Sequence, residues 1–542
     1  MNLRRRALLA AAAALPLAAC TRTEPAAYAG GWVGAIAERG HRLRDTKSGA
    51  LPVPDVQRRA PVLIVGAGIS GLAAARTLMR GGVDDVHVLD LEDEAGGNAR
   101  GHRLAGMACP LGAHYLPVPG EQAVEVIELL EALGLRHMAG GEPVYDERHL
   151  CHSPQERLCV DGHWFEGLLP PIEALPVDQR AGTLAQYRRF GALVDRMSAR
   201  GAFAMPTARS TWSPELDALD ALAFAPWLAA QGLDAPALRW YLDYCCRDDY
   251  GAGAAQVSAW SGLHYFASRH GFRAPGDGAP ERDGVLTWPE GNAWLSTRLA
   301  APLGERLHTG MVALRVTEDR SDVSVDVWNA RDRRSERWTA SNVILALPLF
   351  VAARLLASKP DALVQAVAAM RHAPWLVGNL HLDDALADRP GAPPSWDNVI
   401  YDPASPLPTL GYVDAMHQST RSIPGPTVLT SYWALGGNTR DELAQQRARL
   451  LNEPWSTWSQ AVVRELTRVH ADLPAKVRQV DLMRYGHAMS IPVPGLRSSA
   501  ALAALAAPQP RVHFAHTDLS AYSVFEEAMY QGVRAGAAVR AG

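Results

Sequence analysis

Short apolar runs separated by glycines dominate residues 62–90. The run Val62–Val65 predicts one buried strand, because it is too short to form a helix. An apolar, alanine-rich stretch over Ile69–Arg80 predicts a helix, and a second apolar run, Val86–Leu89, predicts another strand that ends in Asp90. Strand, helix and strand in this order indicate a parallel β-α-β unit.

Three glycines in G-x-G-x-x-G spacing lie between the first strand and the helix. Gly66 would make the tight turn, Gly68 would let a pyrophosphate approach the backbone, and Gly71 would let the helix pack on the strand. The pair Ile69–Ser70 would stand at the positive end of the helix, and Asp90 would accept hydrogen bonds from ribose hydroxyls. The sequence therefore predicts a dinucleotide-binding site.

The same alternation of strands and helices returns twice. Residues 285–349 contain VLTWPEGNAWLSTRLA, GMVALRVTED, SDVSVDVWNA and NVILALPL, which predict a turn, a helix, a strand hairpin and a further strand. Residues 511–539 predict a strand ending at Phe514–Ala515 and a helix that begins near Phe525. Between these parts lie helical runs such as AVEVIELLEALGL and TLAQYRRFGALVDRM, and the strand-like stretches LVGNLHLDD and TVLTSYWALG.

The residues after Asp90 indicate which dinucleotide is bound. Gly96 and Gly97 follow six residues later and lead into Asn98 and Arg100. This resembles the second dinucleotide motif of the flavoprotein superfamily of amine oxidases, L-amino-acid oxidases and phytoene desaturases, where strand, acid, loop and Gly-Gly-Arg accompany FAD. Asn98 stands where that superfamily has arginine, and Arg100 would supply the missing cation. The resemblance implies FAD rather than NAD.

The resemblance continues to the C-terminus and implies further cofactor contacts. Val312 corresponds to the residue whose backbone contacts adenine, and Asp518 to the acid beside the ribityl chain. The helix near Phe525 would direct its positive end at the flavin pyrimidine and stabilise an anionic reduced flavin. His516 and Glu527 replace glycines of the family pattern.

A turn similar to the one beneath the flavin in the family occurs in PLGAHYLPV, residues 110–118. It makes Gly112, Ala113 and His114 neighbours of the flavin ring. The family's covalent attachment through a C-terminal cysteine is excluded, because no cysteine follows Cys246. FAD is therefore expected to bind without a covalent bond.

A lysine that holds a water near flavin N5 in the family's amine oxidases is missing. It would belong to the strand WLVGNLHL, residues 375–382, where Gly378 or Asn379 stands instead. Its absence lowers the expectation of ordinary oxygen-using amine oxidation.

Three residues are candidates for the catalytic centre. Tyr522, in the aromatic loop of the terminal motif, would form one wall of a cage over the flavin, or pack as a loop tyrosine. His114 would titrate near neutral pH, or be a hydrogen-bonded structural histidine. Tyr485, with His487, precedes the terminal motif in a segment that often borders the active site in the family. A further group of acids and aromatics would receive a cationic amine, or else cap a helix and fill the core: Asp248, Asp249, Tyr250, Trp260 and His264.

Length and composition limit the class of protein. With 542 residues and 48% hydrophobic content, the chain can bury a large core, and two domains are expected. The formal net charge of −4, from 53 basic and 57 acidic residues, predicts no surface for nucleic acid. No C-x-x-C pair is present, so no metal site is predicted.

The expected fold class is α/β, with a discontinuous Rossmann-like FAD domain (a parallel sheet with helices and a β-meander) interleaved with an α+β substrate domain. The expected division along the chain is a signal peptide with lipobox (1–20), a tether (21–60), FAD-binding segments (61–115, 285–370 and 481–542) and substrate-domain segments (116–284 and 371–480).

The N-terminus is predicted to be an export signal. Arg4–Arg6 precede the apolar stretch Ala7–Ala19, which is too short to span a bilayer. The ending Leu17–Cys20 resembles a bacterial lipobox, which implies that Cys20 is lipidated and anchors the protein to a membrane. The consecutive arginines suggest twin-arginine export to the periplasm, and Thr21 favours the outer membrane.

Residues 21–60 have little periodicity and predict a tether with one short helix around Trp32–Glu38. Cys151 and Cys159 flank an expected hairpin and could pair in an oxidising compartment.

The resemblance implies an exported FAD-dependent oxidoreductase in which flavin N5 receives a hydride from a substrate C–H beside an amine nitrogen. Two alternatives stay open: a desaturase acting on C–C bonds of an apolar substrate, and a flavin-binding lipoprotein without turnover. Besides the membrane, the expected partners are a small-molecule substrate and an electron acceptor, either oxygen or a quinone.

Overall fold

Residues 28–45, 51–199, 201–277, 284–404, 408–419, 421 and 423–541 are described by a computed structural model of the chain. The predictions for the signal peptide, the lipobox and Cys20 lie outside these residues. None of the described helices is long and apolar enough to cross a membrane.

A seven-stranded sheet draws its strands from three distant parts of the chain. Its order is β12-β3-β2-β15-β14-β13, with β21 beside β15; β2, β3, β12, β15 and β21 run parallel, and β13, β14 and β15 form an antiparallel meander. The strands are β2 Val56–Val65, β3 Val86–Asp90, β12 Leu307–Thr309, β13 Met311–Glu318, β14 Val323–Asn329, β15 Arg334–Leu345 and β21 Val512–Phe514.

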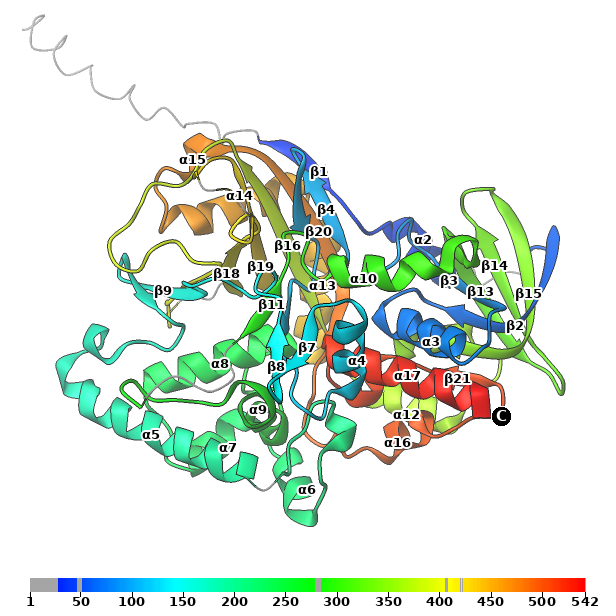
Figure 1. Cartoon of the computed structure of the whole chain (residues 1–542), viewed down its shortest axis with the longest axis horizontal. Coiled ribbons are helices and arrows are strands. Elements are labelled where there is room, and N and C mark those ends of the chain that lie inside the picture. The colour runs from blue at the N-terminus through cyan, green and yellow to red at the C-terminus, as the bar shows by residue number, and fades with distance from the viewer. Residues whose placement is uncertain are drawn as a thin grey trace, which may run out of the picture.

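Two helices from opposite ends of the chain cover one face of this sheet. The helix α3, Ile69–Arg80, has the bounds that the sequence predicts, and α17, Phe525–Ala541, begins where expected. They pack closely because α17 carries small residues: a Cβ on Gly532 would lie 2.2 Å from the Ser70 carbonyl oxygen. Figure 1 shows α17 lying along α3.

The second layer is an eight-stranded mixed sheet of order β1-β20-β16-β19-β18-β17-β9-β10. The predicted strands in LVGNLHLDD and TVLTSYWALG are confirmed as β16 and β19, which pair antiparallel. The strands are β1 Ala29–Trp32, β9 Glu156–Val160, β10 His163–Glu166, β16 His372–Leu382, β17 Asp397–Ile400, β18 Thr409–Asp414, β19 Thr427–Ala434 and β20 Val477–Ser490.

Helices enclose this second sheet on its outer face and at one end. The outer face packs against α14, Trp455–Thr467, where Val462 lies beside Gly378. The residues of β16 that alternate with Gly378, such as Trp375 and Val377, therefore face inward. A group of helices lies below the sheet in Figure 1. These helices are α5 Val177–Ala199, α6 Pro214–Asp220, α7 Phe224–Ala230, α8 Pro236–Tyr250 and α9 Ala259–Tyr265; α13 Arg440–Asn452 and α14 Trp455–Thr467 cover the outer face.

The remaining elements connect the layers. They are β4 Gly101–Leu104, β5 Met107–Pro110, β6 Tyr115–Pro117, β7 Arg136–Ala139, β8 Glu142–Tyr145, β11 Val285–Thr287, α4 Val124–Ala132, α10 Ala293–Ala300, α11 Leu349–Leu355, α12 Asp361–Ala369, α15 Leu473–Lys476, α16 Ala500–Ala506, and the short helices η2 Ile172–Ala174, η3 Thr207–Arg209, η4 Phe266–His270, η5 Ala301–Arg306 and η6 Thr517–Ser520. The α/β fold class with a parallel sheet and a β-meander is confirmed.

The tether expected over 21–60 is wrong for residues 28–45. The segment forms β1, parallel to β20, and then the helix α2, Ala37–Asp45, which packs on β13. Gly30 admits this pairing, because a Cβ there would lie 2.0 Å from the Val480 carbonyl oxygen. This segment, the N-terminal strap, links the two sheets (Figure 1). The short helix expected around Trp32–Glu38 lies later, at Ala37–Asp45, and Trp32 ends the strand β1. The partner of β1 is hundreds of residues away, so local composition did not indicate the strand.

Two smaller points concern the ends of segments. Cys151 and Cys159, whose pairing the sequence left open, are free thiols. They do not flank a hairpin, because the hairpin joins β9, which contains Cys159, to β10. The strand β20 continues to Ser490, so residues 481–490 lie in the eight-stranded sheet rather than with β21.

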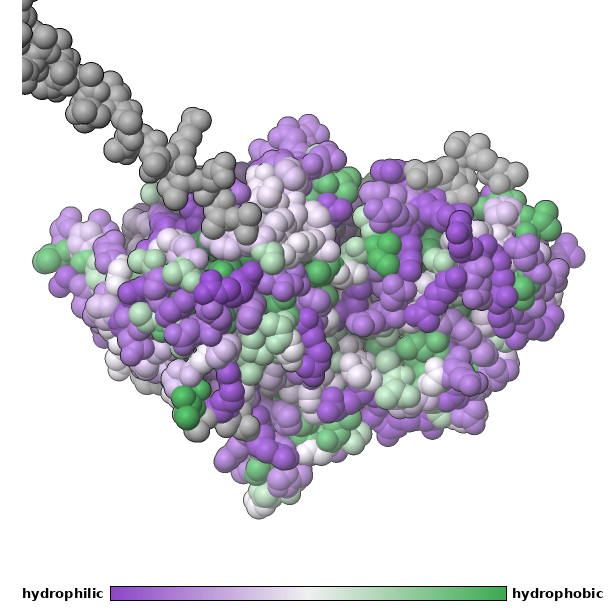
Figure 2. Space-filling view, turned by 90° about the horizontal axis from the view of Figure 1, so that it is seen from above, coloured by the Kyte–Doolittle hydropathy of each residue, from purple (hydrophilic) through white to green (hydrophobic). Residues whose placement is uncertain are grey.

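The face of the molecule seen in Figure 2 is mostly hydrophilic, with hydrophobic residues scattered singly. Such scatter is ordinary for a folded surface and marks no apolar docking face in that view.

Candidate active site

Two glycine turns meet at the end of the parallel sheet. Gly66 has φ of +107°, and a Cβ there would lie 2.2 Å from the Ala346 carbonyl oxygen. The second turn approaches the first so closely that a Cβ on Gly97 would lie 3.1 Å from the Cα of Gly68. Gly68 is also the N-cap of α3 and offers no side-chain cap, which leaves the helix N-terminus open to an anion.

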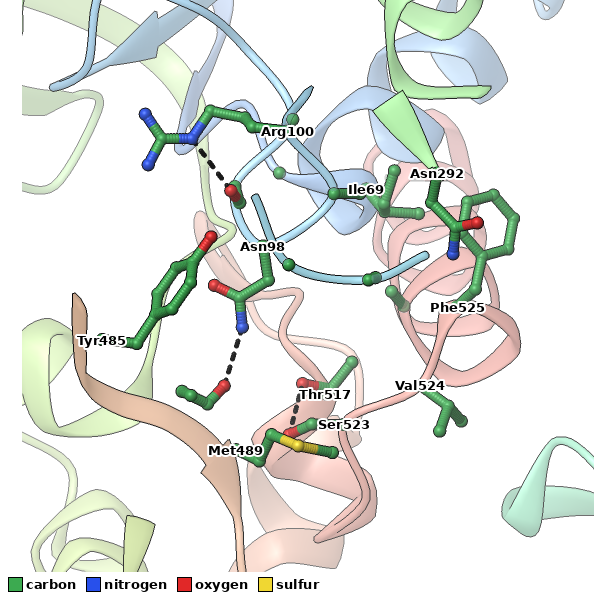
Figure 3. Close-up of a pocket in the computed structure, with 18 of the residues that line it drawn as sticks. Ile69, Asn98, Arg100, Asn292, Tyr485, Met489, Thr517, Ser523, Val524 and Phe525 are labelled. Carbon is green, nitrogen blue, oxygen red and sulfur yellow. Dashed lines mark hydrogen bonds between the residues drawn. The ribbon is translucent and has the colours of Figure 1, made fainter. Parts of the chain in front are cut away.

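These turns line a cavity of about 450 Å³, part of which is drawn in Figure 3. All residues predicted to bind the cofactor lie along it except Gly71 and Val312. Those that line it are Gly66, Gly68, Ile69, Ser70, Asp90, Gly96, Gly97, Asn98, Arg100, Gly112, Ala113, His114, Asp518 and Phe525.

The two exceptions are buried in the protein. Gly71 packs α3 against the first turn, since a Cβ there would lie 1.9 Å from the Gly66 carbonyl oxygen. Val312 is buried within β13, and its backbone contact with adenine stays a prediction.

Asp90 ends β3 at the rim of this cavity. Its carboxylate accepts hydrogen bonds from the backbone N–H of Ala67 at 2.7 Å and of Glu92 at 2.8 Å. These bonds fix its orientation and leave lone pairs that a ribose could use, because a carboxylate offers about four acceptor sites.

The N-terminal strap closes the cavity beside Asp90. Ala35 lines the cavity, and the Ile36 N–H donates to the Glu92 carboxylate at 3.3 Å. Arg39 donates to the Leu91 carbonyl at 2.9 Å and pairs with Asp93 at 3.0 Å. The strap is therefore part of the wall of the predicted cofactor site.

Arg100 lines the cavity, and its role as the cation that replaces the family's arginine stays a prediction. Its guanidinium donates to the Gly97 carbonyl at 3.0 Å (Figure 3). It also donates to the Gly34 carbonyl at 3.3 Å and lies 3.7 Å from Glu92. It thus joins the second glycine turn to the N-terminal strap, with its charge offset by Glu92. Asn98 donates to the Ala488 carbonyl at 2.7 Å and so reaches β20.

Asp518 is fully buried at the opposite wall of the cavity. Its carboxylate accepts from the Leu349 N–H at 2.8 Å and lies 3.0 Å from His372 Nε2. Burial alone would raise its pKa, but His372 and His516 outweigh burial and hold the pKa well below its usual range. Asp518 is therefore a fixed anion beside α17.

Acidic residues reduce the positive electrostatic potential at the N-terminus of α17. Glu526 and Glu527 occupy its first turn, and both are buried. Arg269 lies 3.5 Å from Glu526 and supplies a compensating cation at the cavity wall. The positive charge at this end of α17 therefore comes from Arg269 as well as from the helix dipole, which was the one source that the sequence predicted.

Tyr522 is not an aromatic wall of either cavity. It is buried, donates its hydroxyl hydrogen to Asp249 and accepts from Arg269 at 2.9 Å. Its ring packs on Tyr250, with ring centroids 4.9 Å apart. The expectation of a cage residue at Tyr522 is therefore wrong, because the loop turns this side chain into a polar network inside the protein.

His114 and Tyr485 both line the cavity. Burial lowers the pKa of His114 to about 3, so its ring is neutral near pH 7 and the expected titration there is wrong. The ring stacks on Tyr432 at 4.3 Å. Tyr485 donates to the Leu111 carbonyl at 2.9 Å, and burial raises its pKa to about 12, so it acts as a neutral donor that holds the turn.

Of these three neighbours on β16, Val377 lines the cavity, whereas Gly378 and Asn379 do not. Gly378 faces α14, and Asn379 binds the Pro110 carbonyl and Thr430 within the core. Among the described lysines, Lys359 and Lys476 do not line the cavity.

A second cavity, of about 1000 Å³, adjoins the first. The two share His114, Tyr115, Pro117, Asp248 and Arg269, which form the junction of the cavities. The walls of the second cavity include the aromatic residues Tyr241, Tyr244, Tyr265, Phe272 and Trp396.

Carboxyl groups outnumber basic side chains in this second cavity. It is lined by two arginines, Arg269 and Arg273, and by five carboxylates, namely Glu156, Glu166, Glu173, Asp248 and Asp397. Among the described residues, no lysine or arginine forms an ion pair with Asp248 or Asp397. Burial and the charges of Glu156 and Asp248 raise the pKa of Asp397 well above its usual range. A cationic ligand would relieve this repulsion.

The group of acids and aromatics found in the sequence is divided by the fold. Asp248 and Asp249 line the cavity from the C-terminal turn of α8, rather than capping a helix N-terminus. Tyr250, Trp260 and His264 are buried and line neither cavity. Sequence reasoning missed Arg269 and Asp397, which carry no motif and reach the site only through packing.

The comparisons agree with this architecture. A family model described as flavin containing amine oxidoreductase matches residues 69–540. Polyamine oxidase 7 of Oryza sativa subsp. japonica is 30% identical over 110 residues, which is 19% of this chain and 23% of that protein. L-amino acid dehydrogenase of Synechocystis sp. is 24% identical over 302 residues, which is 55% of this chain and 58% of that protein. The matched parts thus span less than two thirds of these curated relatives.

Among solved structures, the cyclohexylamine oxidase of Brevibacterium oxydans superimposes with a TM-score of 0.62 at 20% identity, over 89% of this chain and 99% of that chain. At this identity the likeness concerns the fold.

We expect Gly97→Ala to weaken FAD binding at least about tenfold, because the added Cβ crowds Gly68 where a pyrophosphate would lie. FAD affinity is measured by titrating the apoprotein. Gly82→Ala is the matched control, since Gly82 also has positive φ, at +84°, but its Cβ would meet open space. Equal FAD affinity in Gly97→Ala and the wild type would contradict the assignment.

We expect Arg39→Ala to release FAD about fivefold faster, because it removes an ion pair and a hydrogen bond worth together about 1 kcal/mol from the N-terminal strap. Stopped-flow fluorescence of released flavin measures this rate. Arg59→Ala, which removes a surface ion pair with Asp322 away from the cavity, should leave it unchanged. An unchanged rate in Arg39→Ala would show that the strap does not retain FAD.

Proposed function

The chain belongs to the flavin containing amine oxidoreductase family, and on this premise we propose that it oxidises a small-molecule amine by removing a hydride from the carbon beside the nitrogen. Its cofactor is FAD. The observation that carries the proposal is the acid-lined cavity that opens at His114, Tyr115 and Asp248 onto the glycine-lined one.

The residues present fit FAD. The glycine turns would let a pyrophosphate approach the backbone, and the Asp90 carboxylate has acceptor sites left for ribose hydroxyls. The buried Oδ1 of Asn292 has no hydrogen-bond partner among the described residues. When bound, FAD supplies a hydride acceptor at N5. We assign the layer of the seven-stranded sheet to FAD and the eight-stranded sheet with α5–α9 to the substrate.

The second cavity would hold the amine. Its carboxylates would attract an ammonium group, and its aromatic walls would cover the apolar part of the substrate and exclude water. An apolar desaturase substrate would leave Asp248 and Asp397 without a cation. Arg269 is already paired with Asp249 and Glu526, so it is poorly placed to receive a substrate carboxylate.

Anaerobic mixing of the holoenzyme with a panel of primary amines, diamines, amino acids and lipids tests this proposal, because it reads flavin bleaching without assuming an electron acceptor. We expect bleaching by amines. Asp397→Asn should raise the concentration for half-maximal bleaching about tenfold or more, since it removes one carboxylate of the cavity. Asp178→Asn, at an exposed position on α5, should change nothing.

Bleaching by apolar lipids alone would support the desaturase, and no bleaching by any compound would support a binding protein without turnover. Remixing the reduced enzyme with oxygen or with a quinone then identifies the acceptor.

We also propose that Cys20 is lipidated and anchors the enzyme to a membrane on its periplasmic side, on the evidence of the lipobox-like Leu17–Cys20. In cells that express the full chain, Cys20→Ala should move the protein from the membrane fraction to the fraction that is free of membranes. Retention of the variant in the membrane fraction would contradict the anchor. A carbonate wash separates lipid anchoring from peripheral adsorption.

A further inference from the structure

Asp248 stands where the two cavities meet. It lies in the C-terminal turn of α8 and lines both cavities. Its side chain is half-buried, and its Oδ2 accepts a hydrogen bond from the Tyr115 hydroxyl at 3.4 Å. A substrate nitrogen held in the second cavity, with its carbon directed at the first, would therefore lie beside this carboxylate.

The adjacent acid is already engaged. Asp249 accepts from the Tyr522 hydroxyl and lies 3.4 Å from Arg269, which also pairs with Glu526. The Asp249 carboxylate is thus held by partners inside the protein. Asp248, one residue earlier on the same helix, has no such ion pair among the described residues.

The other groups at the junction cannot take up a proton near neutral pH. Burial lowers the pKa of His114 to about 3, so its ring is too weak a base. Burial raises the pKa of the Tyr115 hydroxyl well above its usual range, which keeps this group protonated as a donor. Arg269 is a permanent cation. Asp248 is the one proton acceptor among these residues.

An amine must lose a proton before it can lose a hydride. An alkylammonium has no lone pair, whereas the lone pair of a neutral amine stabilises the positive charge that develops as the C–H bond breaks. At neutral pH an ordinary alkylamine is almost wholly protonated, since its pKa is close to that of lysine, about 10.4. The site therefore needs a group that removes this proton.

Resting on the proposed function, we propose that the Asp248 carboxylate accepts the proton of the substrate ammonium. The N–H bond breaks, its electron pair stays on nitrogen, and the proton forms an O–H bond on Asp248. An anion and a cation become two neutral groups, which suits a cavity with little water. The neutral amine can then release its hydride.

The surroundings of Asp248 support this role. Burial and the neighbouring charge of Asp249 raise its pKa to about 7, against the opposing effects of Tyr115 and Arg269. The raised pKa makes the carboxylate a stronger base than an ordinary aspartate, and it is ionised above about pH 7. The titratable and charged groups around it are Asp249, Arg269, Tyr115, Tyr244, Cys245, Asp397 and Tyr432.

Infrared difference spectroscopy of the holoenzyme at pH 8 tests the transfer without turnover. The first probe is 2-phenylpropan-2-amine, which carries N–H protons but no hydrogen on the carbon beside nitrogen. The second is benzyltrimethylammonium, a cation of similar size without N–H. We expect the first probe to produce the C=O band of a protonated carboxyl, and the second probe to produce none.

Two variants assign the band. At a saturating concentration of the probe, Asp248→Asn should abolish it, and Asp397→Asn, which weakens amine binding but leaves Asp248 in place, should keep it. FAD content shows that each variant is folded. A band that survives in Asp248→Asn, or no band in the wild type with the amine bound, would overturn the assignment. Failure of both cations to perturb the flavin spectrum would instead count against the proposed amine site.

The rate of anaerobic flavin reduction gives a second readout, with an amine that bleaches the flavin. In the wild type the rate should rise with pH through about 7, because Asp248 must lose its own proton before it can accept another. Asp248→Asn should be slower by about 100-fold or more at pH 7.5 and lack this rise. The difference in rate between the wild type and Asp248→Asn should become smaller as pH approaches the amine pKa, because more of the amine is then already neutral. A constant ratio across pH would mean that Asp248 only shapes the cavity.

Discussion

The close approach of two glycine turns is the constraint on which the site depends. Gly68 and Gly97 lie so close that a Cβ on Gly97 would be 3.1 Å from the Gly68 Cα, and the Gly96 N–H donates to the Ala67 carbonyl at 2.8 Å. This contact fixes Asn98, whose carbonyl accepts from the Ala113 N–H at 2.9 Å and whose amide reaches Ala488. Through Asn98, these bonds connect the seven-stranded sheet, the turn at residues 110–118 and the eight-stranded sheet.

The N-terminal strap joins the same parts from outside. Its strand β1 extends the eight-stranded sheet, its helix α2 packs on β13, and the turn between them is held by Glu92 and Arg100. Because these bonds surround the end of the cavity near Asp90, movement of one sheet against the other would open the wall of the FAD site.

Local and long-range constraints differ in what the sequence can predict. The unit from Val62 to Asp90 was predicted with correct helix bounds, because its glycines, apolar runs and acid act within about thirty residues. The N-terminal strap was missed because AGGW has no periodicity and becomes a strand only through β20.

The same difference applies inside the site. Tyr522 was expected in the active site, and its neighbours Asp249 and Arg269, distant in sequence, hold it inside the protein instead. Motifs locate the backbone of the cofactor site, whereas the residues that meet the substrate depend on packing between helices and strands that share no motif.

Asp248 and Asp249 illustrate how packing gives two identical residues different chemistry. Successive residues of a helix point about 100° apart, so Asp249 meets Arg269 and Tyr522 while Asp248 enters the junction beside Tyr115. Asp249 is paired with the buried cation Arg269, which it shares with Glu526. Asp248 has no ion pair among the described residues, and its charge disfavours ionisation of Asp397 as long as no cation is bound. An acid without a cation in a cavity is typical of a binding site, so Asp248, rather than the paired Asp249, marks the place where the substrate nitrogen would bind.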